Sequence, residues 1–193
     1  MGKAPQDPAI PLDIMDTAIV YREQGGVDFT VARADVRDIR TGQRFPMHYV
    51  SVKRGRTGAV CVAERNGRLL LARHWRLAIN AWEWEFPRGM GEAGEDPERT
   101  AIRELKEETG LSTSLEQATC LQHMHADAGV LKDDIAVVRI ALTGDDDPTV
   151  TKTDWELTEQ TWCTPEQIDG MIERGEIADG ITLAAYTIWR HRR

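Results

Sequence analysis

The sequence predicts a mixed α/β domain that follows a small antiparallel β unit. Strand-like runs separated by turn signals fill most of the first half of the chain. One helix with clear start and stop signals lies near the middle, and two further helical stretches lie towards the end. The 193 residues fit one domain with an arm, so we expect a mixed sheet with helices packed on it.

Composition restricts the classes of protein to which the chain can belong. Apolar residues make up 41% of the chain and charged residues 29%, which predicts a globular fold with a real core. The net charge of −8, without a clustered Lys/Arg tract, argues against nucleic acid as a partner. No stretch approaches the roughly 18 uncharged apolar residues of a membrane span, and the start has no signal-peptide pattern. We therefore expect no membrane partner.

The three cysteines indicate the redox environment. Cys61, Cys120 and Cys163 are odd in number and far apart, so they predict neither a disulfide framework nor a structural zinc site. Each lies in an apolar strand-like context, where a cysteine usually belongs to the core. A cytoplasmic location is the expectation.

The first quarter of the chain divides into a leader and an arm. Residues 1–16 are predicted to be a flexible leader, because prolines and a glycine interrupt their first part without apolar periodicity. Residues 17–54 are predicted to form a β arm with turns at 24–26 and 41–43. The expected strands cover residues 17–21, 27–39 and 45–52. Such an exposed unit leaves strand edges and apolar side chains that a twofold partner would cover, so we expect a homodimer.

Residues 55–193 are predicted to form the main domain. Asn66-Gly67 is a hairpin turn between two apolar runs, and Pro87 ends a third strand. Asp96, followed by a proline, predicts the start of a helix of about 13 residues, and Gly110 predicts its end. The remaining elements are expected as strands at 59–65, 68–75, 82–87, 118–126, 134–142 and 156–163 and as helices near 165–174 and 179–190.

Three glutamates share one face of the central helix. Glu104 lies three residues before Glu107 and four before Glu108, so the three side chains project from neighbouring turns. A solvated charged face is the alternative, but it usually intersperses lysines among the acids. Oxygen ligands at this density suit Mg²⁺ or Mn²⁺, with water and substrate phosphates completing the coordination. Another face carries the residues expected to pack on the sheet, which are Ala101, Ile102 and Leu105.

Residues beside these glutamates are expected to support them. A backbone carbonyl of Arg88 or Gly89 could add a further metal-binding oxygen. Arg103 can reach Glu107 on its own helix or fold back to Glu95, so its expected role is to orient a carboxylate. Glu95 also lies where the helix macrodipole favours an acid.

The stretch from Gly89 to Leu111 resembles the box of the Nudix hydrolases, G-x5-E-x7-R-E-U-x-E-E-x-G-U, where U is apolar. Every position of the box is matched, by Gly89, Glu95, Arg103, Glu104, Leu105, Glu107, Glu108, Gly110 and Leu111. The wider layout, over about residues 17–190, is similar to the branch that contains ADP-ribose pyrophosphatases. It shares the N-terminal β arm, the approach Trp84-Glu85-x-Pro87-x-Gly89 and a closing pattern at 171–177.

The resemblance implies a Nudix α/β/α sandwich and a Mg²⁺-dependent hydrolysis of the pyrophosphate bond in a nucleoside diphosphate linked to another moiety. ADP-ribose, cleaved to AMP and ribose 5-phosphate, is the first candidate substrate. Another sugar nucleotide, such as GDP-mannose or ADP-glucose, is the alternative. A non-catalytic ligand sensor and a nucleoside-triphosphate cleanser are further alternatives, although sensors usually carry a damaged box and cleansers lack so long an arm.

The family pattern also implies roles for residues. Glu104 and Glu108 would be the chief metal ligands and Glu107 the next, while Glu95 and Arg103 would support the box. The base that activates water in this branch is a glutamate on a later loop, where this chain offers Glu156 first and Glu159 second. The arms of two subunits would exchange and help to form the substrate pocket.

Three residues are expected to bind substrate. Arg76 matches an arginine that contacts substrate phosphate or base in this branch, with a surface salt bridge as the alternative. Glu85 belongs to the approach to the box. Trp82, together with Trp75 and Trp84, could stack an adenine, although tryptophans near a strand are more often core or dimer interface.

Some positions depart from the family pattern or allow a second interpretation. The loop at 125–129 keeps a glycine but lacks the proline typical of ADP-ribose enzymes, and Arg88 replaces a small residue. Both departures bear on which sugar nucleotide is cleaved. His123 and His125 are spaced to share a face of a strand, as a metal pair or, more commonly, as a surface stripe. The acidic run at 145–147 fits a turn tip better than a cation site.

Overall fold

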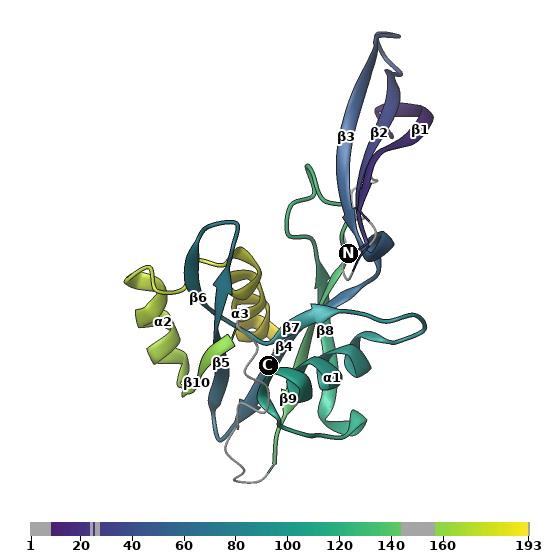
Figure 1. Ribbon diagram of the computed structural model, residues 1–193. Helices are drawn as coiled ribbons and strands as arrows, with labels where there is room; N and C mark the ends of the chain where they lie inside the picture. The colour runs from purple at the N-terminus through teal and green to yellow at the C-terminus, as the bar shows by residue number, and fades with distance from the viewer. Residues whose placement is uncertain (1–8, 24, 26–27, 144–156, 193) are drawn as a thin grey trace, which may run out of the picture. The chain divides into compact units, whose positions relative to one another are not determined.

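The computed structural model describes residues 9–23, 25, 28–143 and 157–192 (Figure 1). The chain divides into two compact units. The first contains residues 1–55 and 127–132, and the second contains residues 56–126 and 133–193. The two units are described in turn.

The first unit is a three-stranded antiparallel sheet. Its strands are β1 (Leu12–Glu23), β2 (Phe29–Asp38) and β3 (Arg44–Val52), in the order β1-β2-β3, followed by the short turn η1 (Lys53–Gly55). The predicted antiparallel β unit is therefore confirmed. β1 begins earlier than expected, because residues 12–16 of the predicted leader pair with the end of β2, with Leu12 opposite Asp38. Segment 127–132 adds to β3 of the same unit, since the N–H of Val50 donates to the carbonyl of Val130 at 2.8 Å.

The second unit is built on a seven-stranded mixed sheet. Its strands are β4 (Gly58–Arg65), β5 (Arg68–Arg76), β6 (Ala81–Glu85), β7 (Arg88–Met90), β8 (Ala118–Met124), β9 (Ile135–Ala141) and β10 (Leu157–Cys163). The order is β10-β5-β4-β9-β8, with β6 beside β5 and β7 beside β4. β4 and β9 run parallel and the other pairs are antiparallel, which confirms the predicted mixed sheet.

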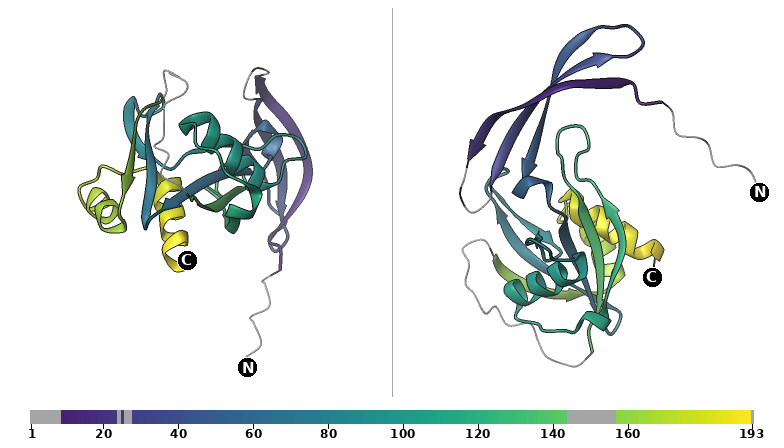
Figure 2. Two further views of the ribbon diagram at one scale, coloured as in Figure 1. Left: turned by 90° about the horizontal axis from the view of Figure 1, so that it is seen from below. Right: turned by 90° about the vertical axis from the view of Figure 1, so that its right-hand side faces the viewer.

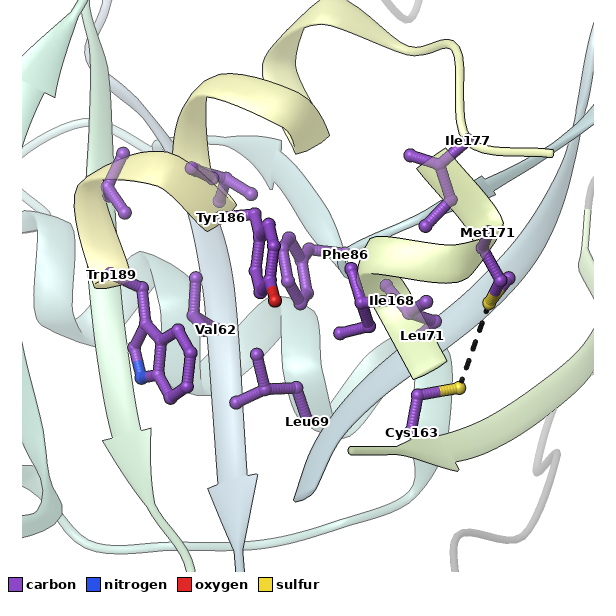
Figure 3. Close-up of a cluster of buried hydrophobic side chains, with 13 residues drawn as sticks. Val62, Leu69, Leu71, Phe86, Cys163, Ile168, Met171, Ile177, Tyr186 and Trp189 are labelled. Atoms are coloured by element: carbon purple, nitrogen blue, oxygen red, sulfur yellow. Dashed lines mark hydrogen bonds between the residues drawn. The ribbon is translucent and has the colours of Figure 1, made fainter. Parts of the chain in front are cut away.

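Helices cover both faces of this sheet (Figure 2). α1 (Pro97–Thr109) packs on one face, while α2 (Pro165–Glu173) and α3 (Gly180–Arg192) pack on the other. Successive residues of β4 point to opposite sides, so Cys61 joins the core under α1 and Val62 joins the core under α3. Figure 3 shows the core under α3, where Trp189 lies near Val62 and Leu69. The α/β/α sandwich implied by the resemblance is thus present, and among the described residues no helix is long and apolar enough to cross a membrane.

α1 begins and ends where the sequence predicts. The Asp96 carboxylate accepts the N–H of Arg99 at 2.9 Å, and Gly110 adopts a left-handed φ of 73° at the end of the helix. Ala101 and Leu105 are completely buried against the sheet, as expected. The helix therefore holds its glutamates at fixed positions beside the sheet.

Two elements differ from expectation. β7 lies after Pro87, where no strand was predicted, and it forms because Arg88 pairs with Val60 and Met90 with Gly58 of β4. Tertiary pairing overrides the weak strand preference of glycine at Gly89. β6 ends at Glu85 and not at Pro87, because proline has no N–H to donate to a ladder.

Cys61 and Cys163 are buried free thiols, as predicted, and Cys120 is half-buried.

Candidate active site

Arg103 of α1 gathers the carboxylates of the box. It donates to Glu95 through Nε at 3.1 Å and Nη2 at 3.0 Å, and to Glu104 at 2.7 Å. It also reaches Glu107 at 3.4 Å and the carbonyl of Met90 at 3.0 Å. Both contacts considered for Arg103 from the sequence therefore occur together. The hydrogen bonds from Arg103 lower the pKa of Glu95 to about 2, so that this carboxylate stays ionised.

Gly89 lets the Glu104 carboxylate approach the backbone of β7. A Cβ added at Gly89 would lie 2.0 to 2.3 Å from the three carboxyl atoms of Glu104. Any side chain at this position would occupy the space of the carboxylate. The glycine of the box is thus required for contact between α1 and β7, more than for a turn.

We expect Gly89→Ala to abolish most activity with little loss of stability. The methyl group can push away the flexible end of Glu104, which costs the fold little but moves the carboxylate by an ångström or more. Misplacement on that scale lowers turnover about 10²-fold. Turnover and melting temperature of the variant would be measured beside Gly25→Ala, where an added Cβ meets nothing within 4 Å. Wild-type turnover in Gly89→Ala would show that the position of Glu104 does not matter.

Glu108 has one carboxylate oxygen that is left without a partner. Its Oε2 atom is buried without a hydrogen-bond partner, and its side chain is only 20% exposed. Burial and the charge of Glu104 raise the pKa of Glu108 to about 8, although a hydrogen bond from the backbone of Arg88 opposes the shift. A cation beside this carboxylate would reverse the shift and satisfy the oxygen.

The donors of this face fit a hard divalent cation. Glu104, Glu107 and Glu108 offer carboxylate oxygens, and β7 passes beside Glu104 with the backbone carbonyls of Arg88 and Gly89. Among the described residues, no three or more such side chains already form a cluster arranged to hold a metal. A metal would therefore compete with Arg103 for two of the glutamates, whereas Oε2 of Glu108 has no partner to lose.

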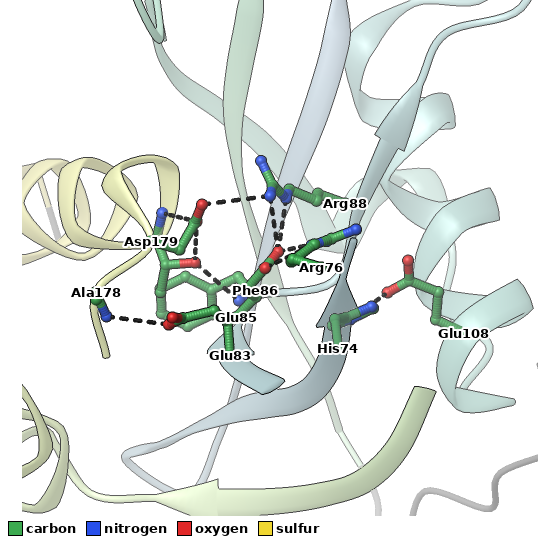
Figure 4. A network of polar contacts seen from close by, with 10 residues as sticks. His74, Arg76, Glu83, Glu85, Phe86, Arg88, Glu108, Ala178 and Asp179 are labelled. Carbon is green, nitrogen blue, oxygen red and sulfur yellow. Dashed lines mark hydrogen bonds and ion pairs between the residues drawn. The ribbon is translucent and has the colours of Figure 1, made fainter. Parts of the chain in front are cut away.

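A second network joins two arginines to the carboxylates of Glu85 and Asp179 (Figure 4). Glu85 is completely buried and accepts Nε of Arg76 at 2.6 Å and Nε of Arg88 at 2.9 Å. Arg88 also reaches Asp179 at 3.3 Å, and Asp179 accepts the N–H of Thr182 at the start of α3. Burial alone would raise the pKa of Glu85, but the hydrogen bonds from Arg76 and the charge of Arg88 hold it below its usual value.

These arginines line a cavity of about 240 Å³ within the second unit. The other lining residues are Gly58, Ala59, Gly89, Met90, Ile135 and Ile181. The cavity thus combines two cationic side chains with an apolar wall and the backbone of the box glycine. Such a mixture suits a phosphate group attached to a less polar moiety.

The expected substrate-binding residues have different environments. Arg76 faces the cavity, as a phosphate-binding residue would. Glu85 has no exposed surface, so it acts on the cavity only by holding Arg76 and Arg88. Trp82 is 38% exposed and packs edge-on against Trp75 with ring centroids 5.5 Å apart, and it does not line this cavity.

Both candidates for the catalytic base come after the box. Glu156, the first candidate, and the acidic run at 145–147 lie outside the described residues. Glu159 is 56% exposed and pairs with Arg73 at 3.3 Å. His74 follows Arg73 on the same strand, and its side chain lies near that of Glu108.

The histidine pair has partners of its own. His123 contacts Asp134 at 2.8 Å, and His125 contacts the carbonyl of Asp133 at 2.7 Å. Both side chains are at least half exposed. This arrangement corresponds to the surface alternative.

The sequence analysis missed two residues of the site. His74 lies on β5 two residues before Arg76, and this strand spacing could have placed both on one face. Asp179 precedes α3 and accepts an N–H from its first turn, which an N-cap pattern could have indicated. Their partners, Glu108 and Arg88, are distant in the sequence.

Comparisons with known proteins give the similarities of the whole chain. Residues 52–186 match the family model described as NUDIX domain. A protein of Xenopus laevis named nucleoside diphosphate-linked moiety X motif 6 is 33% identical over 91 residues, covering 47% of this chain and 41% of that protein. The ADP-sugar pyrophosphatase of Mus musculus is 37% identical over 78 residues, covering 40% of this chain and 35% of that protein. The chain thus spans less than half the length of these curated relatives.

A solved structure supports the fold independently. The crystal structure of an ADP compounds hydrolase matches with a TM-score of 0.79, and the match covers 96% of each chain. The sequences are 19% identical, so this likeness concerns the fold alone.

Proposed function

Because this chain belongs to the Nudix family, we propose that it is a metal-dependent hydrolase that cleaves the pyrophosphate bond of a nucleoside diphosphate linked to another moiety. The observation that carries the proposal is the unpartnered, buried Oε2 of Glu108 on the glutamate face of α1. The arginine-lined cavity provides a place for the substrate phosphates in the same unit.

Each part of the site has a role in this reaction. Mg²⁺ or Mn²⁺, when bound, would supply charge to neutralise phosphate oxygens and to acidify a water molecule. Glu104 and Glu108, with Glu107, would hold the metal. Arg76 and Arg88 would bind the phosphates as preorganised cations. Glu156 is our proposal for the carboxylate that accepts the proton of the attacking water, since its loop position follows the family pattern.

ADP-ribose is the substrate that we propose first, with AMP and ribose 5-phosphate as products. The name of the mouse relative, ADP-sugar pyrophosphatase, supports an ADP-linked sugar. Arg88 supports the alternative of a different sugar nucleotide, because its guanidinium occupies a wall where the family pattern has a small residue. ADP-ribose and a different sugar nucleotide would place different chemical groups against Arg88.

The proposal is tested with purified protein and Mg²⁺ by coupled phosphatase release of phosphate. The panel contains ADP-ribose, ADP-glucose, GDP-mannose and nucleoside triphosphates. We expect turnover of ADP-ribose to exceed that of the others. Preference for another sugar nucleotide would assign Arg88 a role in specificity, whereas no turnover of any compound would contradict an enzymatic function.

We also propose that the protein forms a cytoplasmic homodimer through its N-terminal sheet. Several large apolar side chains of that sheet are about half exposed or more, namely Ile14, Met15, Ile19, Val20, Tyr21 and Met47. A second copy would cover them. Light scattering at micromolar concentration should give twice the mass of the chain, and replacement of Ile19 and Tyr21 by glutamate should give the monomer mass. A monomeric mass for the unmodified protein would contradict the dimer.

The free thiols fit a reducing compartment, and they support the cytoplasmic location that we propose.

A further inference from the structure

We propose that His74 is a positioning residue that holds the Glu108 carboxylate in the orientation needed to bind the metal. The inference rests on the proposed function, because it concerns the same metal site. His74 belongs to β5, and Glu108 lies near the end of α1. The two side chains point towards each other across the space between the sheet and the helix (Figure 4).

Two buried polar atoms face each other at this point. Nε2 of His74 and Oε2 of Glu108 are 3.7 Å apart, and each is buried without a hydrogen-bond partner. The His74 side chain is 5% exposed, so water does not reach it freely. A buried polar group without a partner is unfavourable, and a hydrogen bond between two such groups satisfies both of them.

A hydrogen bond from Nε2–H of His74 to Oε2 of Glu108 would satisfy both atoms. The present separation is too long for one, and the bond requires the two atoms to approach to about 2.9 Å. That bond fixes the plane of the carboxylate. Because each carboxylate oxygen has two lone pairs, Oε2 can accept the bond and still ligate a metal. Histidines and carboxylates that ligate metals are commonly oriented by such outer partners.

The backbone of Glu108 is held from the neighbouring strand. Nε2 of Gln160 on β10 donates to the Glu108 carbonyl at 2.8 Å. β10 pairs with β5, with Leu157 opposite His74. Two adjacent strands therefore fix one residue of α1, one through its main chain and the other through its side chain.

Binding of Mn²⁺ to the purified protein, followed by electron paramagnetic resonance, tests the inference without measuring turnover. We expect His74→Phe, which keeps an aromatic ring but removes the donor, to weaken Mn²⁺ binding at least about 10-fold. His74→Gln keeps an N–H donor of similar reach and should recover most of the affinity. Melting temperatures of both variants would identify any loss of folding.

The outcomes separate this inference from the proposed function. Wild-type affinity in His74→Phe would overturn the inference, as would equal weakening in His74→Gln and His74→Phe. Glu108→Gln serves as the reference for the proposed function, since it should weaken binding whatever His74 does. If Glu108→Gln bound Mn²⁺ as the wild type does, the proposed metal site itself would be wrong.

Discussion

Glu104→Gln is expected to lower turnover about 10²–10³-fold while the protein remains folded, the range observed when a group that stabilises charge in a transition state is removed. The amide keeps the size of the side chain and can still accept a hydrogen bond from Arg103. It loses the negative charge that a divalent cation requires. The loss should therefore appear in turnover and Mn²⁺ affinity, with only a small change in melting temperature.

The matched control for this variant is Glu173→Gln. Glu173 is an exposed carboxylate at the end of α2, outside the glutamate face of α1. Its replacement removes the same charge from the protein but should leave turnover unchanged. Wild-type turnover in Glu104→Gln would refute the assignment of the site. The Glu104 carboxylate, which packs against Gly89, lies at the centre of that site.

The parts of this site that the sequence predicts are those within a single helix. The spacing of Glu104, Glu107 and Glu108 fixes their common face, because helix geometry repeats every 3.6 residues. The contact of Arg103 with Glu107 follows from the same geometry, and Glu95 lies just before the helix, within reach of the same arginine. Capping residues likewise predict both ends of α1 to the residue.

The parts that the sequence does not predict depend on pairings between distant segments. Arg88 and Asp179 are 91 positions apart, and nothing in the local pattern of either residue identifies the other. His74 meets Glu108 only because the fold brings the end of β5 close to the end of α1. β7 exists only through its register with β4. Such contacts are set by the packing of the whole sheet, which periodicity alone does not specify.

Glu85→Ala is expected to cause the largest loss of stability of any variant considered, about 3 kcal/mol in the free energy of unfolding. Removing one partner of a buried ion pair typically costs about 3–5 kcal/mol, because the other charge remains without compensation. Here two cations, Arg76 and Arg88, lose their shared carboxylate. Both are partly exposed, at 30% and 21% of their side chains, so water offsets some of the cost.

Dependence on pH distinguishes this charge effect from lost packing. The arginines hold the pKa of Glu85 below its usual value in the folded state, so its charge stabilises the fold above the pKa of an unfolded glutamate, about 4.3. That contribution disappears as the pH falls through the lower folded pKa. Urea unfolding of the wild type and of the neutral isostere Glu85→Gln should therefore differ most at pH 7, and the difference should shrink below about pH 4. A difference that is the same at both pH values would assign the effect to shape, and equal stability of wild type and Glu85→Ala at pH 7 would contradict a structural role for the buried carboxylate.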